Sequence, residues 1–166
     1  MKAKPRRRLL GALGCLWILA SIGYGGYWVL SWVYEPVYAV NCLSNLKQIG
    51  QAHLAYAADH DDRFTPASRW MTNLKKVEPF RSRPEMLQCP DPREREPGYA
   101  MAIRMSARAR SSIRNPSEEV LTFEVNGRSP NQSGDPRSAA RFHPSYQFGF
   151  ADGSVGKREG RQRPVK

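Results

Sequence analysis

The sequence predicts an α+β protein. A long N-terminal helix, transmembrane in its first part, continues into an amphipathic stem that is packed by a small C-terminal antiparallel sheet. Residues 9–34 form a continuous run without a charged side chain. Residues 43–57 then space their apolar side chains as one helix face does, and segments after position 120 alternate apolar and polar residues between turn signals. These three observations carry the predicted fold.

The run at 9–34 is long enough to cross a membrane, because a helix needs about 20 apolar residues to span the hydrocarbon core. A cluster of Lys and Arg precedes it, and all 15 acidic residues of the chain follow it. Basic flanks stay on the cytoplasmic side of a membrane. We therefore expect residues 1–8 to be a basic cytoplasmic leader and residues 35–157 to form an extracytoplasmic domain.

Two other interpretations of the N-terminus stay open. Val37-Tyr38-Ala39 is similar to a signal-peptide cleavage site, and Cys15 follows Gly14 as in a lipoprotein site. The apolar run is longer than the roughly 7–15 residues of a signal peptide, and it continues well beyond Cys15. An uncleaved single-pass anchor is therefore the expectation.

The stem is expected to follow Pro36. Proline removes a backbone donor and disfavours helix at the preceding residue, so the sequence predicts a kink or a short break there. Helical spacing then resumes and places a set of apolar side chains and one histidine on a single face. The predicted packing face consists of Leu43, Leu46, Ile49, His53 and Leu54.

Two C-terminal strands are predicted. Residues 120–125 are rich in β-branched and aromatic side chains, and residues 146–150 place three aromatic rings on one face. Asp152-Gly153 predicts a two-residue type I′ hairpin turn, which would pair Phe150 with Val155. Residues 158–166 are expected to be a basic disordered tail.

Cys42 and Cys89 both follow the predicted anchor, on the side of the membrane where disulfides persist. A bridge between them would tie the stem to the rest of the domain and contribute about 2–4 kcal/mol. Two separate thiols are the alternative, and sequence alone leaves the choice open.

The chain is strongly basic, with a formal net charge of +11. Outside the leader and the tail, the cations gather in a segment that could contact DNA or another polyanion. A solvated surface is the alternative, because no aromatic ring for base stacking is interleaved with these cations. The candidate polyanion contacts are Arg104, Arg108, Arg110 and Arg114.

Asp59, Asp61 and Asp62 could offer oxygen ligands to calcium, although the cluster lacks the glycine and the distal glutamate of an EF-hand loop. A surface turn that ends the stem helix is the alternative. The chain has no Cys-x-x-Cys pair, nucleophile elbow or Gly-rich phosphate loop. The sequence therefore predicts neither a cofactor site nor an enzyme.

Four segments resemble one known family: "CLSNLKQIGQAHLAYAADHDDRF", "LQCP", "NPSEEVLTFE" and "FGFADGSV". They are similar to prepilin-like proteins related to the major pseudopilins of type II secretion, whose C-terminal signature is a histidine, a spacer and Asp-Gly. The resemblance spans residues 40–156. It implies a pilin-like fold, a bacterial inner-membrane location, and pilin-like subunits or other envelope proteins as partners.

The chain departs from the family pattern at two places. Gly11, the candidate cleavage point, is followed by Ala12, and Leu16 stands where such proteins usually carry Glu. His143 is one residue too close to Asp152 for the usual spacer. The sequence is therefore interpreted as a membrane-anchored, pseudopilin-like structural or interaction protein with a degenerate prepilin signal. A surface module that binds polyanions is the second interpretation.

Overall fold

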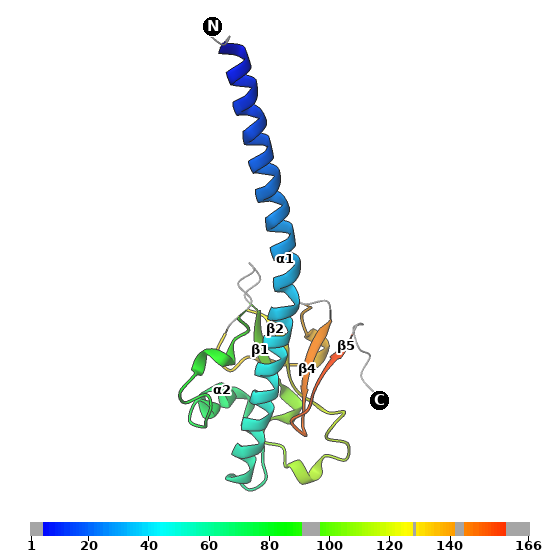
Figure 1. The fold of residues 1–166 in the computed structure, drawn as a ribbon. Helices are drawn as coiled ribbons and strands as arrows, with labels where there is room; N and C mark the ends of the chain where they lie inside the picture. Colours follow the sequence, from blue (N-terminus) through cyan, green and yellow to red (C-terminus); the bar gives the residue numbers. More distant parts are fainter. Residues whose placement is uncertain (1–4, 91–96, 128, 142–144, 159–166) are drawn as a thin grey trace. The chain divides into compact units, whose positions relative to one another are not determined.

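A computed structural model describes residues 5–90, 97–127, 129–141 and 145–158 (Figure 1). The chain divides into two compact units, Met1–Val37 and Tyr38–Lys166. Helix α1, Pro5–Ala58, contributes residues to both. His143 of the family signature and the tail after Arg158 lie outside the described residues.

Helix α1 continues through Pro36 without interruption, so the predicted short break is wrong. Proline removes one hydrogen bond, to the carbonyl of Trp32, at a local cost of about 3 kcal/mol. A helix of 54 residues tolerates this loss, because propagation from formed turns is favourable on both sides. The kink at Pro36 stays a prediction.

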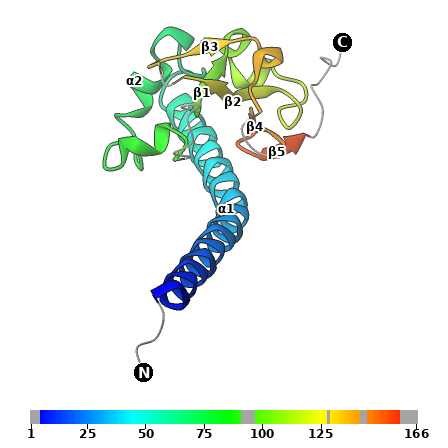
Figure 2. The same ribbon diagram turned by 90° about the horizontal axis from the view of Figure 1, so that it is seen from above.

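The second unit adds a five-stranded sheet and several short helices to the last part of α1 (Figures 1 and 2). The short helices are η1 Ala67–Arg69, α2 Trp70–Leu74, η2 Pro84–Leu87, η3 Ile103–Met105, η4 Arg110–Ser112 and η5 Pro136–Ser138. The strands are β1 Pro97–Ala102, β2 Val120–Asn126, β3 Ser133–Gly134, β4 Tyr146–Phe150 and β5 Val155–Arg158. The predicted α+β class, with a long N-terminal helix against a sheet, is confirmed.

The sheet is mixed, so the prediction of a purely antiparallel C-terminal sheet is wrong. Its strand order is β3-β1-β2-β4-β5, and β3 runs parallel to β1 at one edge while every other pair is antiparallel. Strand β3 has only two residues, too few for a period-two pattern. The Gln132 carbonyl holds it there by accepting from Met101 N (3.0 Å) and Trp70 Nε1 (2.8 Å).

One stripe of α1 is buried under the sheet. Leu46, Ile49 and His53 of the predicted face are inaccessible to solvent, whereas Leu43 and Leu54 are half-buried at its margins. The buried stripe therefore coincides with the centre of the predicted face and extends to Cys42 and Ala57 beside it. Its buried members, at spacings of three and four, are Ala39, Cys42, Leu46, Ile49, His53 and Ala57.

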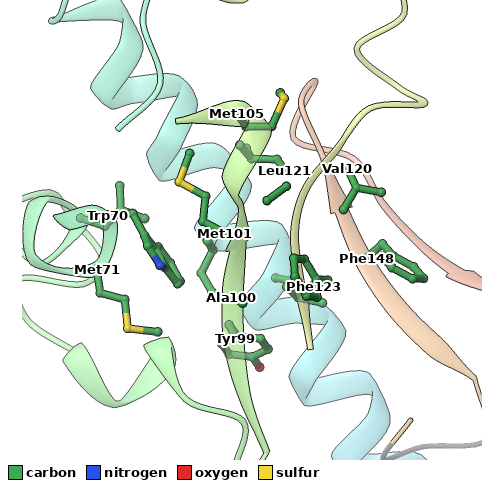
Figure 3. Packing of buried hydrophobic residues seen from close by; sticks show 14 of the residues in the cluster. Trp70, Met71, Tyr99, Ala100, Met101, Met105, Val120, Leu121, Phe123 and Phe148 are labelled. Carbon is green, nitrogen blue, oxygen red and sulfur yellow. The ribbon is translucent and has the colours of Figure 1, made fainter. Parts of the chain in front are cut away.

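Large side chains fill the space around β1 and β2. Trp70 from α2, Met101 and Tyr99 from β1 and Phe123 from β2 are fully buried members of one cluster (Figure 3). A buried aromatic ring removes about 150–250 Å² from water. Helix α2 and the segment after α1 are therefore fixed to the sheet by side chains, mainly Trp70.

Polar side chains also lie between the sheet and α1. Tyr99 Oη donates to the Cys42 carbonyl at 3.2 Å, and Gln147 Nε2 donates to the Ala39 carbonyl at 2.9 Å. Both donors are buried. Because a buried donor without an acceptor costs about 1–3 kcal/mol, these bonds specify how the strands sit along the helix.

A disulfide joins Cys42 of α1 to Cys89, which follows η2, with the two Cα atoms 5.1 Å apart. This distance lies inside the range of about 4.4–6.8 Å that disulfides require. Asn45 Nδ2 also donates to the Gln88 carbonyl at 3.2 Å. The covalent and polar contacts together attach the 84–89 segment to the stem.

The β4–β5 turn lies at Asp152-Gly153, but its predicted two-residue type I′ form is wrong. Phe150 N donates to the Ser154 carbonyl, which encloses a three-residue loop and pairs Gly149 with Val155. Of the three described loop residues, only Gly153 has a positive φ, 79°. Asp152 Oδ1 accepts from Ser154 N at 2.8 Å, an Asx-type bond that holds Asp152 out of the left-handed region.

Gly153 is also the point at which this turn touches α1. A Cβ built on Gly50 would lie 3.1 Å from the Gly153 Cα, and a Cβ on Gly153 would lie 2.6 Å from Gln51 Nε2 and 2.9 Å from Leu54 Cδ1. Glycine therefore satisfies both the backbone conformation and the close approach to the helix.

The Gly153→Ala variant should lower the free energy of unfolding by about 1 kcal/mol more than Gly127→Ala does. Both glycines have positive φ, where a Cβ costs roughly 1–2 kcal/mol, but Gly127 has open space around its Cβ position. Only Gly153→Ala adds overlap with α1. Urea unfolding of the full chain in detergent micelles measures both; equal losses would contradict the contact between turn and helix.

Candidate functional site

A pocket of about 340 Å³ opens on the face of the sheet that is turned away from α1. Gln147 and Gly149 of β4 approach α1, so Phe148 between them points to the opposite side. The segment after η3, β5 and η5 complete the walls. The charged lining residues are Arg104, Arg108, Arg114, Glu118, Glu119, Asp135, Arg137 and Arg158.

Arg158 is one of the lining residues of this pocket. Its guanidinium carbon is 5.5 Å from the ring centroid of Phe148 and 5.3 Å from that of Phe150, a cation–π arrangement. Burial lowers the pKa of Arg158, and the negative charge of Glu118 opposes this shift. No carboxylate of the described residues lies within 4.0 Å of Arg158. Arg158 is the last residue of β5, so the prediction of a disordered tail from residue 158 onward is wrong at this position.

Two other arginines form ion pairs inside the pocket. Arg137 binds both carboxylate oxygens of Asp135, and these hydrogen bonds lower the pKa of Asp135 to about 2. Arg104 Nη2 lies 3.0 Å from Glu119 Oε2. The geometry of that contact does not meet the angle of a hydrogen bond, so it is a Coulombic pair whose N–H groups can serve another acceptor.

The remaining two arginines have no carboxylate partner among the described residues. Arg108 donates to the side-chain and backbone oxygens of Ser112, at 3.3 and 3.5 Å, and to the Met105 sulfur at 4.0 Å. Arg114 is exposed and has no hydrogen bond or ion pair to described residues. Glu118 accepts from Asn115 Nδ2 at 3.2 Å. The described lining of the pocket thus contains arginines with N–H groups that have no acceptor, and a smaller number of carboxylates.

Arg110 lies apart from the other predicted polyanion contacts. Its Nε is 2.8 Å from Asp62 Oδ1, and Asp62 Oδ2 accepts from Ser111 N at 2.9 Å. The bond from the Ser111 N–H is the main cause that lowers the pKa of Asp62. The Asp62 carboxylate, one of the three candidate calcium ligands, is therefore engaged in holding η4 against the end of α1.

His53 is a packing residue of the stem. It stacks on Trp70 with 5.7 Å between ring centroids, and its Nδ1 is 3.1 Å from Thr65 Oγ1. Thr65 can donate to the Met101 sulfur at 3.6 Å, which leaves its oxygen to accept from Nδ1–H. Nε2 is then the bare acceptor nitrogen, without a partner in the described part of the chain. Burial lowers the pKa of His53 to about 3.

Cys42, Cys89 and Glu124 have their ligand atoms within 4.8 Å of one another, a grouping that could hold a metal by proximity alone. The two sulfurs are bonded to each other. A metal requires deprotonated thiols, so in the disulfide form this group offers no thiolate. In this form the two cysteines attach η2 to the stem.

Comparison of the chain with protein-family models, curated protein sequences and solved structures finds no match. Function must therefore be argued from the site itself. Three of the four predicted polyanion contacts line the pocket. Arg137, Arg158 and Phe148 also line it and were not predicted as contacts. Arg158 follows the segment that the predicted Asp152-Gly153 hairpin places beside residues 146–150, and this position was the one available signal.

Acidification should destabilise the protein through His53. The pKa of this group is about 3 in the folded chain and about 6.5 in the unfolded chain, so the unfolded state binds more protons between these values. The free energy of unfolding should fall by about 1.4 kcal/mol per pH unit as the pH drops below 6.5, in addition to the effects of carboxylates.

Urea unfolding of the full chain at pH 7, 6, 5 and 4 measures this slope. His53→Gln should lose that contribution to the slope, whereas His60→Gln, at an exposed position, should keep the wild-type slope. Identical slopes in all three proteins would show that His53 is protonated without cost in the folded state.

Proposed function

We propose that this protein is a membrane-anchored, pseudopilin-like structural or interaction protein of the bacterial envelope, linked to a type II secretion or type IV pilus-like system. One observation carries the proposal. Among the described residues, α1 is the one helix long and apolar enough to cross a membrane, and none of its most apolar window is buried within the chain. Trp17, Trp28 and Trp32 are among its exposed side chains. An apolar surface of this size favours lipid or another apolar helix over water.

The proposed orientation has the N-terminus in the cytoplasm and residues 38–158 outside it. The basic leader supports this direction. The Cys42–Cys89 disulfide supports it independently, because disulfides persist in the bacterial periplasm and are rare in the cytosol. The head would then present its surface to other envelope proteins or to pilin-like subunits.

The pilin-like part of the proposal rests on the resemblance of residues 40–156 and on the helix-against-sheet architecture. Leu16, in place of the usual Glu, and Ala12 after Gly11 are the reasons to propose an anchor that keeps its leader. A protein of this kind acts by position and contact, with no chemistry required of its head.

The intact mass of the protein extracted from membranes should correspond to the complete chain that starts at Met1. Alkylation under denaturing conditions without reductant should modify one cysteine, Cys15, because Cys42 and Cys89 are bonded to each other. Reduction before alkylation should expose all three. The Cys89→Ser variant is the matched control and should give two modified cysteines without reductant.

Other results would overturn separate parts of this proposal. A mass that starts at Ala12 would show prepilin-type processing. Three modified cysteines without reductant would remove the support for an extracytoplasmic head. Release of the protein from membranes by alkaline carbonate would contradict the anchor.

A second candidate function is recognition of an anionic partner by the head. The observation that favours it is the arginine-lined pocket, which contains Arg104, Arg108 and Arg114 together with Arg137 and Arg158. The position of Arg110, paired with Asp62, weakens the original picture of one continuous basic segment. Binding of a DNA duplex that weakens steeply with salt would support a polyanion partner.

A further inference from the structure

The charges that line the pocket do not cancel. Among the described residues that line it, five arginines face three carboxylates, which leaves two positive charges. Two of the pairs, Arg104–Glu119 and Arg137–Asp135, are internal. Arg108, Arg114 and Arg158 therefore share the single remaining carboxylate of Glu118. A ligand that carries two negative charges would neutralise this excess.

The guanidinium groups also keep donors available. Arg114 makes no bond to described residues, Arg108 makes long bonds to Ser112, and the Arg104 pair is not aligned as a hydrogen bond. Arg158 is held over two aromatic rings and is partly withdrawn from water, which lowers its pKa. An incoming oxyanion would supply the hydrogen-bond acceptors and the negative charge that these guanidinium groups lack.

The kind of cation and the size of the cavity limit the chemical class and the size of the ligand that can bind. The described cations that line the cavity are all arginine, whose planar fork matches the paired oxygens of phosphate and carboxylate groups. A phosphate monoester carries about −1.5 to −2 charges near neutral pH, whereas a carboxylate carries one. A volume of about 340 Å³ lies at the small end of ligand pockets, and a DNA duplex cannot enter it.

We propose that this pocket binds a phosphate monoester, carried by a small sugar-sized molecule or by the terminal unit of a larger one. The proposal deepens the second candidate function and rests on it, and it is independent of the membrane anchor. Arg108, Arg114 and Arg158 bind the phosphate oxygens. Asn115 and Glu118, which are exposed lining residues, meet the hydroxyl groups of the attached body.

Isothermal titration calorimetry of the full chain in maltoside micelles, in a buffer free of phosphate and sulfate, tests the proposal. Glucose 6-phosphate is the probe, with glucose and glucuronate as comparisons. Glucose 6-phosphate should bind, glucuronate should bind at least about tenfold more weakly because it has one charge, and glucose should not bind. Equal binding of glucuronate and glucose 6-phosphate would overturn the choice of a phosphate.

Variants locate the site. Arg114→Gln should weaken binding of glucose 6-phosphate by about tenfold or more, the loss expected for a hydrogen bond to a charged group. Arg110→Gln is the matched control: it removes the same charge from a half-buried arginine outside the pocket and should leave binding unchanged. Arg158→Lys keeps the charge over the rings but loses the fork, and should also weaken binding while the thermal midpoint stays near that of the wild type.

A gain of affinity is expected from Glu119→Gln. This change leaves Arg104 without its acid and raises the net charge of the pocket, so glucose 6-phosphate should bind at least about twofold more tightly. Looser binding in this variant would contradict an electrostatic site at this position.

The two levels of the proposal fail in different ways. Binding of a DNA duplex that Arg110→Gln and Arg114→Gln weaken equally, without binding of glucose 6-phosphate, would overturn the phosphate pocket and retain the polyanion function. Binding of glucose 6-phosphate that both variants weaken equally would overturn the location of the site. Absence of binding by every probe would overturn both.

Discussion

The contact between one stripe of α1 and the sheet is the constraint on which the rest of the second unit depends. Its buried residues recur at three and four positions, so one side of the helix meets the strands over about five turns. Leu46 and Ile49 supply apolar area, and the bonds of Tyr99 and Gln147 to α1 carbonyls define the position along the axis. The disulfide attaches the segment that follows η2 to α1, and the close approach of Gly50 and Gly153 attaches the β4–β5 turn to the same helix.

That contact also decides where a binding site can form. Because α1 covers one face of the sheet, Phe148 and Phe150 of β4 are directed to the other face, where no long helix is available to cover them. The Arg158 guanidinium lies over both rings instead, and residues between Arg104 and Val120 line the pocket together with Phe148. A guanidinium that lies over aromatic rings on this face becomes part of the wall of the cavity. The pocket is therefore a consequence of how the second face of the sheet is closed.

The two parts of α1 differ in the surroundings that their side chains require. The apolar N-terminal part has no partner among the described residues, and lipid is the environment that suits it. The C-terminal part is a mixed polar and apolar surface that requires its own sheet. The pocket belongs entirely to the second unit, so the proposed recognition of an anion and the proposed membrane anchor can be tested separately.

The sequence by itself determined the class of fold, the apolar N-terminal part of the long helix and the stem. These depend on local periodicity and on runs of like residues, which are visible without three-dimensional context. It also located the hairpin at Asp152-Gly153, and it identified Arg104, Arg108 and Arg114 as candidate contacts for an anionic partner. Tertiary structure decided the three-residue form of that turn, because an Asx bond at Asp152 and the contact with Gly50 select it. It also decided the parallel edge strand β3, the pairing of Cys42 with Cys89, the withdrawal of Arg110 toward Asp62, and the arrival of Arg137 and Arg158 at the pocket. Each of these joins residues that are distant in the chain, and no local pattern encodes which distant partners will meet.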